Sequence, residues 1–589
     1  MKRSIALFLS LLLILTACGS QDQPTTAPTA QPTSAPTVSA VEKDDLFSDR
    51  DQDTTVTTEP DMSITFLGSS IETTAPGVRI SGTTVTITRA GTYTLTGTLN
   101  SGMVIVDATK DEKIQLVLNN VSITSPTSAA IYVRQADKVF LTTAEGSENH
   151  LSNGGSFEAI DENSIDAVIF SKDDLTLNGS GTLTIESPAG HGIVSKDELT
   201  ITSGTFSITT ASHGMTGKDS VAIDGGSFTI DAGKDGIQAD HDEDAALGFV
   251  YIIGGTFDIT ASGDGISASS ALQIDGGSFT ILSGGGSKNG EAHSSQGWGG
   301  MGGGPGGRPG GRSSETTTNN TDDSISMKGL KAGTELIVNG GTFTLDCADD
   351  AVHSNGNLTV TNGIFDVKTG DDGFHAEENL TVSGGTITVT ESYEGLEALH
   401  ILVSGGSIRL TASDDGLNAA GGADQSGMGG RDQMFGRPGG WGGMGAGNGS
   451  ITISGGDLYV NASGDGIDAN GTLEITGGYT VVVGPTRGDT ATLDYDVSAV
   501  ISGGTFIGTG ASGMAQTFSN SQNQGVLAVQ VGSAQAGTQI TLTDSNGNLL
   551  IDHTPELSFN VVIISNPDIQ KGERYTLTVG SNSDSFEAH

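Results

Sequence analysis

The amino-acid sequence predicts an all-β protein in which one short structural unit is stacked on itself many times. Three observations lead to this fold class. Apolar residues recur at a fixed step of 22, as in Leu336, Leu358 and Leu380. Within each step apolar and polar residues alternate, which is the periodicity of β-strands, and the alternation breaks at glycine pairs such as Gly340-Gly341. The chain also contains 89 glycines but only 14 prolines.

The regular repeat begins at Leu175 and reaches about residue 510. A period of 22 residues with about three short strands per turn is typical of a parallel β-helix, whose coils stack at about 4.8 Å. The spacing predicts about twelve regular coils of ~22 residues. One position of the repeat is repeatedly phenylalanine, and this ladder consists of Phe206, Phe228, Phe257, Phe279, Phe343 and Phe365.

The segments around the β-helix region of 171–510 are expected to cap or interrupt it. Residues 62–170 show strand-like alternation without a clean period, which suits irregular N-terminal capping coils. Residues 511–589 predict a small C-terminal antiparallel β cap with a hairpin turn at Asn546-Gly547. The glycine-rich insertions 283–321 and 421–449 carry both tryptophans, so they are either ligand-contacting flaps or tolerated loops.

The N-terminus has the features of an export signal. Lys2 and Arg3 precede an apolar run, and residues 15–18 read Leu-Thr-Ala-Cys, which resembles a bacterial lipobox. Residues 1–18 are therefore expected to be a lipoprotein signal peptide with Cys18 as the lipidated residue, although an ordinary signal peptide is the alternative. Residues 19–61 are rich in Thr and Pro and predict a disordered tether. We expect an extracytoplasmic protein, lipid-anchored to the bacterial cell membrane and contacting it only through this anchor.

The charge balance restricts the partners. The chain has 70 acidic against 26 basic residues, for a formal net charge of −44. Nucleic acid is therefore an improbable partner, whereas cations or sugars are natural ones. Cys347 is the only cysteine besides Cys18, so no disulfide is expected. The folded part is expected to be a monomer.

Acidic residues recur in register in the later copies of the repeat. The second acid falls fourteen places after the first apolar residue of the copy, as with Leu336 and Asp350. Ionised groups about 4.8 Å apart repel by roughly 1 kcal/mol in water and about 3.5 kcal/mol at an effective dielectric of about 20. A divalent cation such as Ca²⁺, which takes six to eight oxygen ligands, would remove this repulsion.

The predicted Ca²⁺ ligands are Asp322, Asp323, Asp349, Asp350, Asp371, Asp372, Glu394, Glu397, Asp414, Asp415, Asn418, Asp465 and Asp468. The alternative is that these carboxylates only cap backbone N–H groups in Asp-Gly turns, which suffices for single acids such as Asp235 and Asp264. His353 and His375 are soft ligands for calcium, so we expect them outside the ion's direct ligands or in contact with sugar. Zinc is not expected, since no cysteine belongs to the cluster.

Several of these segments, in the same order, resemble a family of bacterial secreted carbohydrate-binding proteins. The resemblance runs from about residue 62 to the C-terminus, and its segments include Ser171-Lys172-Asp173-Asp174-Leu175, Asp349-Asp350-Ala351-Val352-His353, Tyr393-Glu394-Gly395-Leu396-Glu397 and Gly464-Asp465-Gly466-Ile467-Asp468. It implies a right-handed parallel β-helix, shaped like pectate lyases, with calcium on the acidic turns and binding of cellulose-like or polygalacturonate-like polymers.

We therefore expect a surface protein that binds polysaccharide, acidic or from plant cell walls, through calcium and without catalysis. A calcium-dependent polysaccharide lyase of the pectate type is the first alternative, with Lys368 or Arg409 as the base that abstracts the proton beside a uronate carboxylate. An adhesin or envelope scaffold, in which calcium serves only rigidity, is the second alternative.

Overall fold

The computed structural model describes residues 46–56, 62–241, 243–290, 326–420 and 448–589, all of which lie in one unit from Val41 to His589. Cys18, both tryptophans, Asp322 and Asp323 are outside these described residues. The described part confirms the all-β class, with one sheet of 47 strands and a second of 4. Its helices are short: α2 (Asp49–Gln52) and the 3-10 helix η2 (Ser287–Asn289). No helix in this part is long and apolar enough to cross a membrane.

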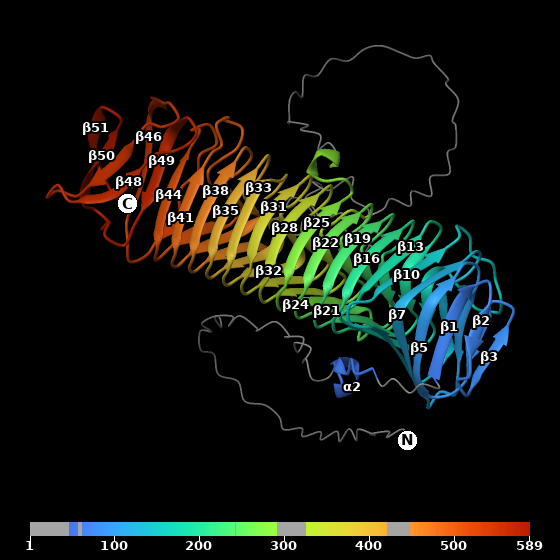
Figure 1. Cartoon of the computed structure of the whole chain (residues 1–589). Helices are drawn as coiled ribbons and strands as arrows, with labels where there is room; N and C mark the ends of the chain where they lie inside the picture. Colours follow the sequence, from blue (N-terminus) through green and yellow to red (C-terminus); the bar gives the residue numbers. More distant parts are fainter. Residues whose placement is uncertain (1–45, 57–61, 242, 291–325, 421–447) are drawn as a thin grey trace, which may run out of the picture. The chain divides into compact units, whose positions relative to one another are not determined.

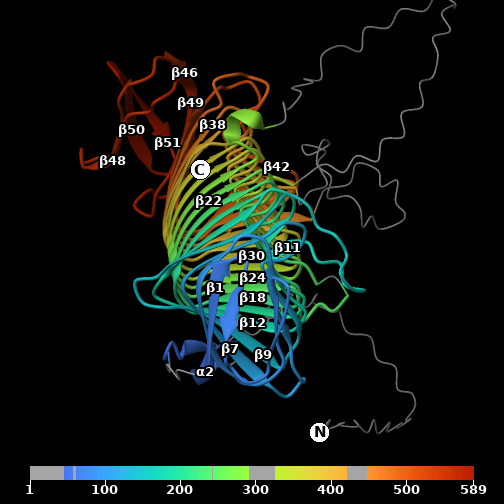
Figure 2. The same ribbon diagram turned by 45° about the vertical axis from the view of Figure 1, so that its right-hand side comes forward.

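Parallel pairing between successive repeats organises the large sheet. From β11 to β29 each strand pairs with the strand three places later, so the strands form three parallel ladders (Figure 1). The alternation of the sequence explains the ladders, because strands such as β19 and β22 expose every second residue and bury the others. Strands of one ladder lie in file, as Figure 2 shows for β12, β18, β24 and β30.

The first ladder contains β12 (Asp174–Gly179), β15 (Glu198–Ile201), β18 (Ser220–Ile223), β21 (Phe249–Ile252), β24 (Ala271–Ile274), β27 (Glu335–Val338), β30 (Asn357–Val360), β37 (Gly449–Ile453), β40 (Gly471–Ile475), β43 (Ser498–Ile501) and β45 (Asn520–Ser521). The second contains β13 (Thr182–Ser187), β16 (Thr205–Thr210), β19 (Ser227–Ala232), β22 (Thr256–Ala261), β25 (Ser278–Ser283), β28 (Thr342–Cys347), β31 (Ile364–Thr369), β33 (Thr386–Glu391), β35 (Ser407–Ala412), β38 (Asp457–Ala462), β41 (Tyr479–Val483) and β44 (Thr505–Gly510).

The third ladder contains β11 (Ala167–Ser171), β14 (His191–Ser195), β17 (Met215–Gly217), β20 (Ile237–Ala239), β23 (Ile266–Ala268), β26 (Leu330–Ala332), β29 (Val352–Ser354), β36 (Leu417–Ala419), β39 (Ile467–Ala469) and β42 (Asp494–Tyr495). Two longer strands, β32 (Phe374–Val382) and β34 (Leu396–Val403), belong to both the first and the third ladder. The acidic turns of the sequence directly precede strands of this third ladder.

The interior between the ladders is apolar and in register. The predicted phenylalanine ladder is a stack of parallel rings on the second ladder, with centroids 5.1 Å apart for Phe206 and Phe228 and 4.5 Å apart for Phe343 and Phe365. Gly341 precedes one of these rings with a φ of +111°, a conformation that favours glycine. Stacking identical side chains in successive repeats is what keeps the register, because a slip of one residue would turn every buried ring outward.

Residues before the regular repeat continue the ladders. These strands are β1 (Ser63–Gly68), β2 (Ile71–Thr73), β3 (Val78–Ser81), β4 (Thr84–Ile87), β5 (Gly91–Leu99), β6 (Met103–Asp107), β7 (Lys113–Ser125), β8 (Ile131–Gln135), β9 (Lys138–Thr143) and β10 (Glu148–Asn153). Most of these strands pair in parallel, but β1 pairs antiparallel with β2, and β3 pairs antiparallel with β4. Before them, residues 46–53 of the predicted tether are not an unstructured chain, since they pack on the first ladder through Phe47 and α2.

Antiparallel strands close the C-terminal end. Strand β44 pairs antiparallel with β49 (Phe559–Ser565), which pairs antiparallel with β46 (Val526–Ala534). The four-stranded sheet is entirely antiparallel and contains β48 (Leu549–His553), β47 (Ile540–Thr543), β50 (Arg574–Val579) and β51 (Asn582–Glu587). A separate apolar core that includes Ile507, Ile564 and Leu577 joins these strands to the end of the second ladder.

Candidate functional site

The acidic residues of the sequence form two columns along the third ladder. We define the turn column as the residues two places before each strand, which are His213, Asp235, Asp264, Lys328, Asp350, Asp372, Glu394, Asp415 and Asp465. We define the strand column as the second residue of each strand, which includes Lys331, His353, His375, Glu397, Asn418 and Asp468. The regular period therefore does place the predicted ligands of successive repeats side by side.

Carboxylates of the turn column hold the backbone of the next repeat. The amide of Asp264 donates to Asp235 Oδ1 at 2.8 Å, and the amide of Asp372 donates to Asp350 Oδ1 at 3.1 Å. The amide of Asp465 donates in the same way to Asp415 Oδ1 at 2.5 Å. Capping of backbone N–H groups, which the sequence analysis considered sufficient for single acids, thus also involves the paired acids Asp350 and Asp415. It uses one oxygen of each carboxylate.

Lys328 occupies the turn column between Asp264 and Asp350, and the sequence analysis missed it. Its ammonium lies 2.8 Å from Asp349 Oδ1 and 2.9 Å from Asp350 Oδ2, and the residue is only 5% exposed. Burial by itself would raise the pKa of Asp350, but Lys328 and His353 hold that pKa well below its usual range. At this place in the column a lysine therefore balances the charge that the sequence had assigned to a cation.

One signal could have revealed Lys328. The tripeptide Lys328-Gly329-Leu330 has the same pattern of charged, small and apolar residues as Asp350-Ala351-Val352 in the next repeat. The sequence analysis instead assigned Asp322 and Asp323, which follow the first insertion, to the acidic pattern. Both are outside the described residues.

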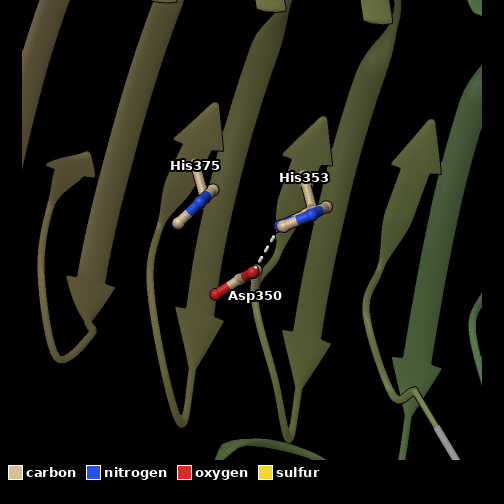
Figure 3. A group of neighbouring side chains, drawn as sticks. All are labelled: Asp350, His353 and His375. Carbon is tan, nitrogen blue, oxygen red and sulfur yellow. Dashed lines mark hydrogen bonds and ion pairs between the residues drawn. The ribbon is translucent and has the colours of Figure 1, made fainter. Parts of the chain in front are cut away.

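The buried His353 and the partly buried His375 are partners of the carboxylates. His353 Nδ1 lies 2.7 Å from Asp350 Oδ2 (Figure 3). Its Nε2 lies 2.7 Å from Asn355 Oδ1. The two imidazole rings stack with centroids 4.8 Å apart, which continues the in-register packing of the strand column.

His375 is held between two acids. Its Nδ1 lies 3.1 Å from Asp372 Oδ2 and 2.5 Å from Glu397 Oε2. Burial would lower the pKa of His375, but Glu397 and Asp372 raise it well above the ordinary value. His375 lowers the pKa of Glu397 against the effect of burial, whereas burial, Asp371 and Glu397 raise the pKa of Asp372 well above its usual range. His375 therefore compensates mainly Glu397, and neither histidine is placed as a surface contact for sugar.

Among the residues that the structure describes, four groups of side chains bring potential metal-ligand atoms within 4.8 Å of one another. They are Asp349–Asp350–Asp371, Asp350–His353–His375, Asp372–His375–Glu397 and Asp415–Asp465–Asp468. The first three include, or directly contact, Lys328 or a histidine. The fourth, which we call the oxygen cluster, offers carboxylate oxygens alone.

The oxygen cluster has the donor chemistry that a hard cation needs. Burial raises the pKa of Asp415 well above its ordinary value, and Asp465 and Asp414 add to the effect. Burial likewise raises the pKa of Asp465 to about 6. Carboxylates that repel one another in this way fit Ca²⁺, which prefers several oxygen ligands. Like any acidic cluster, it can also share protons, so the chemistry permits a cation without establishing one.

Glycine at position 464 lets the carboxylates approach the backbone. A Cβ at Gly464 would lie 2.3 Å from Asp414 Oδ1 and 2.4 Å from Asp415 Oδ1. Any larger residue would have to displace both acids. Nearby, Asn418 Nδ2 donates to Glu394 Oε1 at 3.0 Å, so these two predicted ligands contact each other between the oxygen cluster and the histidines.

The two basic residues proposed for lyase chemistry lie on the second ladder. The Arg409 guanidinium is 2.9 Å from Glu556 Oε1 and 3.9 Å from the centre of the Tyr459 ring, so it contributes to packing against the C-terminal sheet. Lys368 lies opposite Asp346 on one neighbouring strand and Glu391 on the other.

Comparison with known proteins relates much of the chain to carbohydrate binding. A family model described as carbohydrate-binding domain-containing protein matches residues 81–373. A protein of Acetivibrio thermocellus with the same description is 38% identical over 134 residues, which are 22% of this chain and 47% of that relative. The match thus spans about half the length of the relative.

A solved structure shows a related sequence. It is described as the polysaccharide lyase-like protein from C. thermocellum, in a gadolinium derivative. It is 35% identical, with a TM-score of 0.37, and the alignment covers 38% of this chain and 91% of that chain. The family match ends at residue 373, so it includes Lys328 and Asp350, whereas the oxygen cluster lies beyond it.

Proposed function

We propose that this protein binds an acidic or plant-cell-wall polysaccharide without catalysis, and that Ca²⁺ held by the oxygen cluster mediates the contact. The observation that carries the proposal is a group of three carboxylates, Asp415 and Asp465 from the turn column and Asp468 from the strand column, with no lysine or histidine in the group. The similarity of residues 81–373 to carbohydrate-binding proteins supports the ligand class.

The chain's own residues would hold the ion through carboxylate oxygens, with Asp414 beside them against Gly464. A bound Ca²⁺ attracts the carboxylates of uronate sugars, which explains how a chain of formal charge −44 could hold an acidic glycan. The acids around Lys328 and His375 already have cationic partners, so their main contribution in this proposal is to the stability of the ladder.

Binding to polygalacturonate tests the proposal. We expect the wild-type protein to be retained in Ca²⁺ and released by a chelator, and the variant Asp415→Asn/Asp465→Asn to lose retention. The matched control is Asp457→Asn, which removes an exposed acid from the start of β38. Retention that ignores both chelator and double variant would contradict the proposal. Unsaturated, ultraviolet-absorbing product would instead indicate a lyase.

We also propose that the three ladders are the faces of a right-handed parallel β-helix of about twelve regular coils. Lipidation at Cys18 would anchor the protein to the bacterial cell membrane, outside the cytoplasm. We also propose that the protein is a monomer. Metabolic labelling with palmitate checks the anchor, because Cys18→Ala should abolish incorporation. Equal labelling of the wild type and the variant would rule it out.

A further inference from the structure

Residues 46–53 form a docked segment on the outward side of the first ladder (Figure 1). Phe47 is 8% exposed and packs with Ala222 and Tyr251. Helix α2 follows, with a capping box in which the Ser48 amide donates to Asp51 Oδ2 at 2.9 Å. Leu46 is partly buried against the same cluster, so the segment has its own local structure and an apolar anchor with Phe47 at its centre.

The carboxylate of Asp51 lies in a built site. Asp51 is 2% exposed, and its Oδ1 is 2.9 Å from Lys138 Nζ and accepts from Thr176 Oγ1 at 2.5 Å. Lys138 is itself only 9% exposed and comes from β9, while Thr176 comes from β12. Two strands of a rigid ladder therefore supply an ammonium and a hydroxyl to one buried carboxylate.

Further donors of the ladder bind neutral oxygens of the segment. Asn178 Nδ2 donates to the Asp51 carbonyl at 2.9 Å, and Thr202 Oγ1 donates to the same carbonyl at 3.0 Å. Aromatic surface borders them, since the Arg50 guanidinium lies 4.9 Å from the centre of the Phe140 ring. Pockets for small polar ligands combine a few oriented hydrogen-bonding groups with apolar and aromatic walls in this way.

We call this surface the Lys138 strip and define it by Lys138, Phe140, Thr176, Asn178, Thr202 and Tyr251. Its donors match a uronate sugar, which has one carboxylate and several neutral oxygen acceptors. Burial raises the pKa of the nearby Asp174 and Glu198, and Lys138 acts on both in the opposite direction. A ligand that replaces the segment covers Lys138 again, so it should bring an anion in place of Asp51, because a buried lysine that loses its bonded carboxylate is costly. A neutral glycan therefore fits the strip less well than an acidic one.

We propose that the Lys138 strip is a second binding site, for the uronate carboxylates of an acidic polysaccharide, and that residues 46–53 close it by placing Asp51 where the ligand's carboxylate binds. The proposal takes its ligand class from the proposed function but uses different residues and needs no metal. When a site is open for only a fraction of the time, its apparent affinity falls by that fraction. Releasing the segment should therefore strengthen binding.

The test uses the full chain in a chelator, so that the oxygen cluster does not contribute. The variant Phe47→Ala/Asp51→Asn removes the apolar anchor and the internal carboxylate. Trypsin cleavage at Arg50, which lies inside the docked segment, reports release. We expect faster cleavage and an affinity for oligogalacturonate that rises by roughly tenfold or more, as a mostly closed site implies.

Two control variants distinguish binding at the Lys138 strip from a general effect of the protein's net charge. Asp49→Asn removes an acid of the same helix that lies outside the Lys138 contact, and it should change neither cleavage nor affinity. Adding Lys138→Met to the releasing variant should abolish the gain. A released segment without any gain in affinity would overturn the proposal, as would a gain that survives Lys138→Met.

A segment that stays protected at Arg50 in the double variant would also overturn it, because Phe47 and Asp51 would then not be what closes the strip. The wild-type protein assayed in Ca²⁺ tests the proposed function separately. Loss of that calcium-dependent binding, with the metal-free gain intact, would count against the oxygen cluster and leave the Lys138 strip supported.

Discussion

Replacing Lys328 by methionine tests the charge balance of the turn column most directly. Lys328 is 5% exposed and bonds to Asp349 at 2.8 Å and to Asp350 at 2.9 Å. Methionine keeps the apolar stem but removes the ammonium. Both carboxylates would then lose the ammonium, and Asp350, at 3% exposed, would keep its contact with His353 but could not be solvated in place of the lysine.

The expected loss follows from the burial of this pair. Removing one partner of a buried ion pair costs about 3–5 kcal/mol, and we expect about 4 kcal/mol here because the side chain of Asp349 is 27% exposed. Asp349, Asp350 and Asp371 would at the same time become a group of oxygens without a lysine. Ca²⁺ at about a hundred times its dissociation constant would restore about 2.7 kcal/mol.

Hydrogen exchange at the amides of β26 and β29 measures this locally, which suits a protein whose repeats contact mainly their neighbours. We expect a lower free energy of opening in the variant, measured in chelator, and a partial recovery in Ca²⁺. The matched control is Lys368→Met, on the exposed side of β31, which should change the free energy by less than about 0.5 kcal/mol. A loss below about 1 kcal/mol for Lys328→Met would refute the reasoning, because removing the ammonium from a buried ion pair should cost more.

Three further predictions concern the oxygen cluster, the thiol and the ring stack. Gly464→Ala should weaken Ca²⁺ binding at least tenfold by calorimetry, because the added Cβ would meet Asp414 and Asp415. The control Gly532→Ala has open space around its Cβ and should not change the affinity. Equal Ca²⁺ affinities of the two variants would contradict the geometry of the oxygen cluster. Burial raises the pKa of Cys347 to about 12, so a thiol reagent at pH 8 should modify it only after unfolding. Phe279→Ala should cost about 3–5 kcal/mol in urea unfolding, because it leaves a gap in the ring stack, and a cost under about 1 kcal/mol would show that the stack closes around it.

The sequence was most informative where one pattern repeats. A step of 22 residues placed Phe343 over Phe365 and Asp350 beside Asp372, since identical spacing in stacked repeats forces identical positions. All described predicted ligands of the acidic set except Asp349, Asp371 and Asp414 lie in the turn or strand column, and those three directly precede members of the turn column.

The sequence was least informative about partners that come from outside the period. Lys328 follows an insertion, so counting residues did not assign it to the column. The contact of Arg409 with Glu556 joins residues 147 apart, and no spacing rule relates them. The docked segment at Asp51 was hidden for the same reason, because its composition is that of a solvated linker and its binding surface comes from distant strands.

The sequence by itself determined the β class, the register of the repeat and the alignment of acids along one ladder, because these depend on the period alone. Only the tertiary structure decided which acids have cationic partners: Lys328 and His375 pair with the acids of one part, whereas in another part burial and the neighbouring acids Asp465 and Asp468 raise the pKa of Asp415. Charge balance depends on distances across space and on burial, and neither is contained in the spacing of residues along the chain.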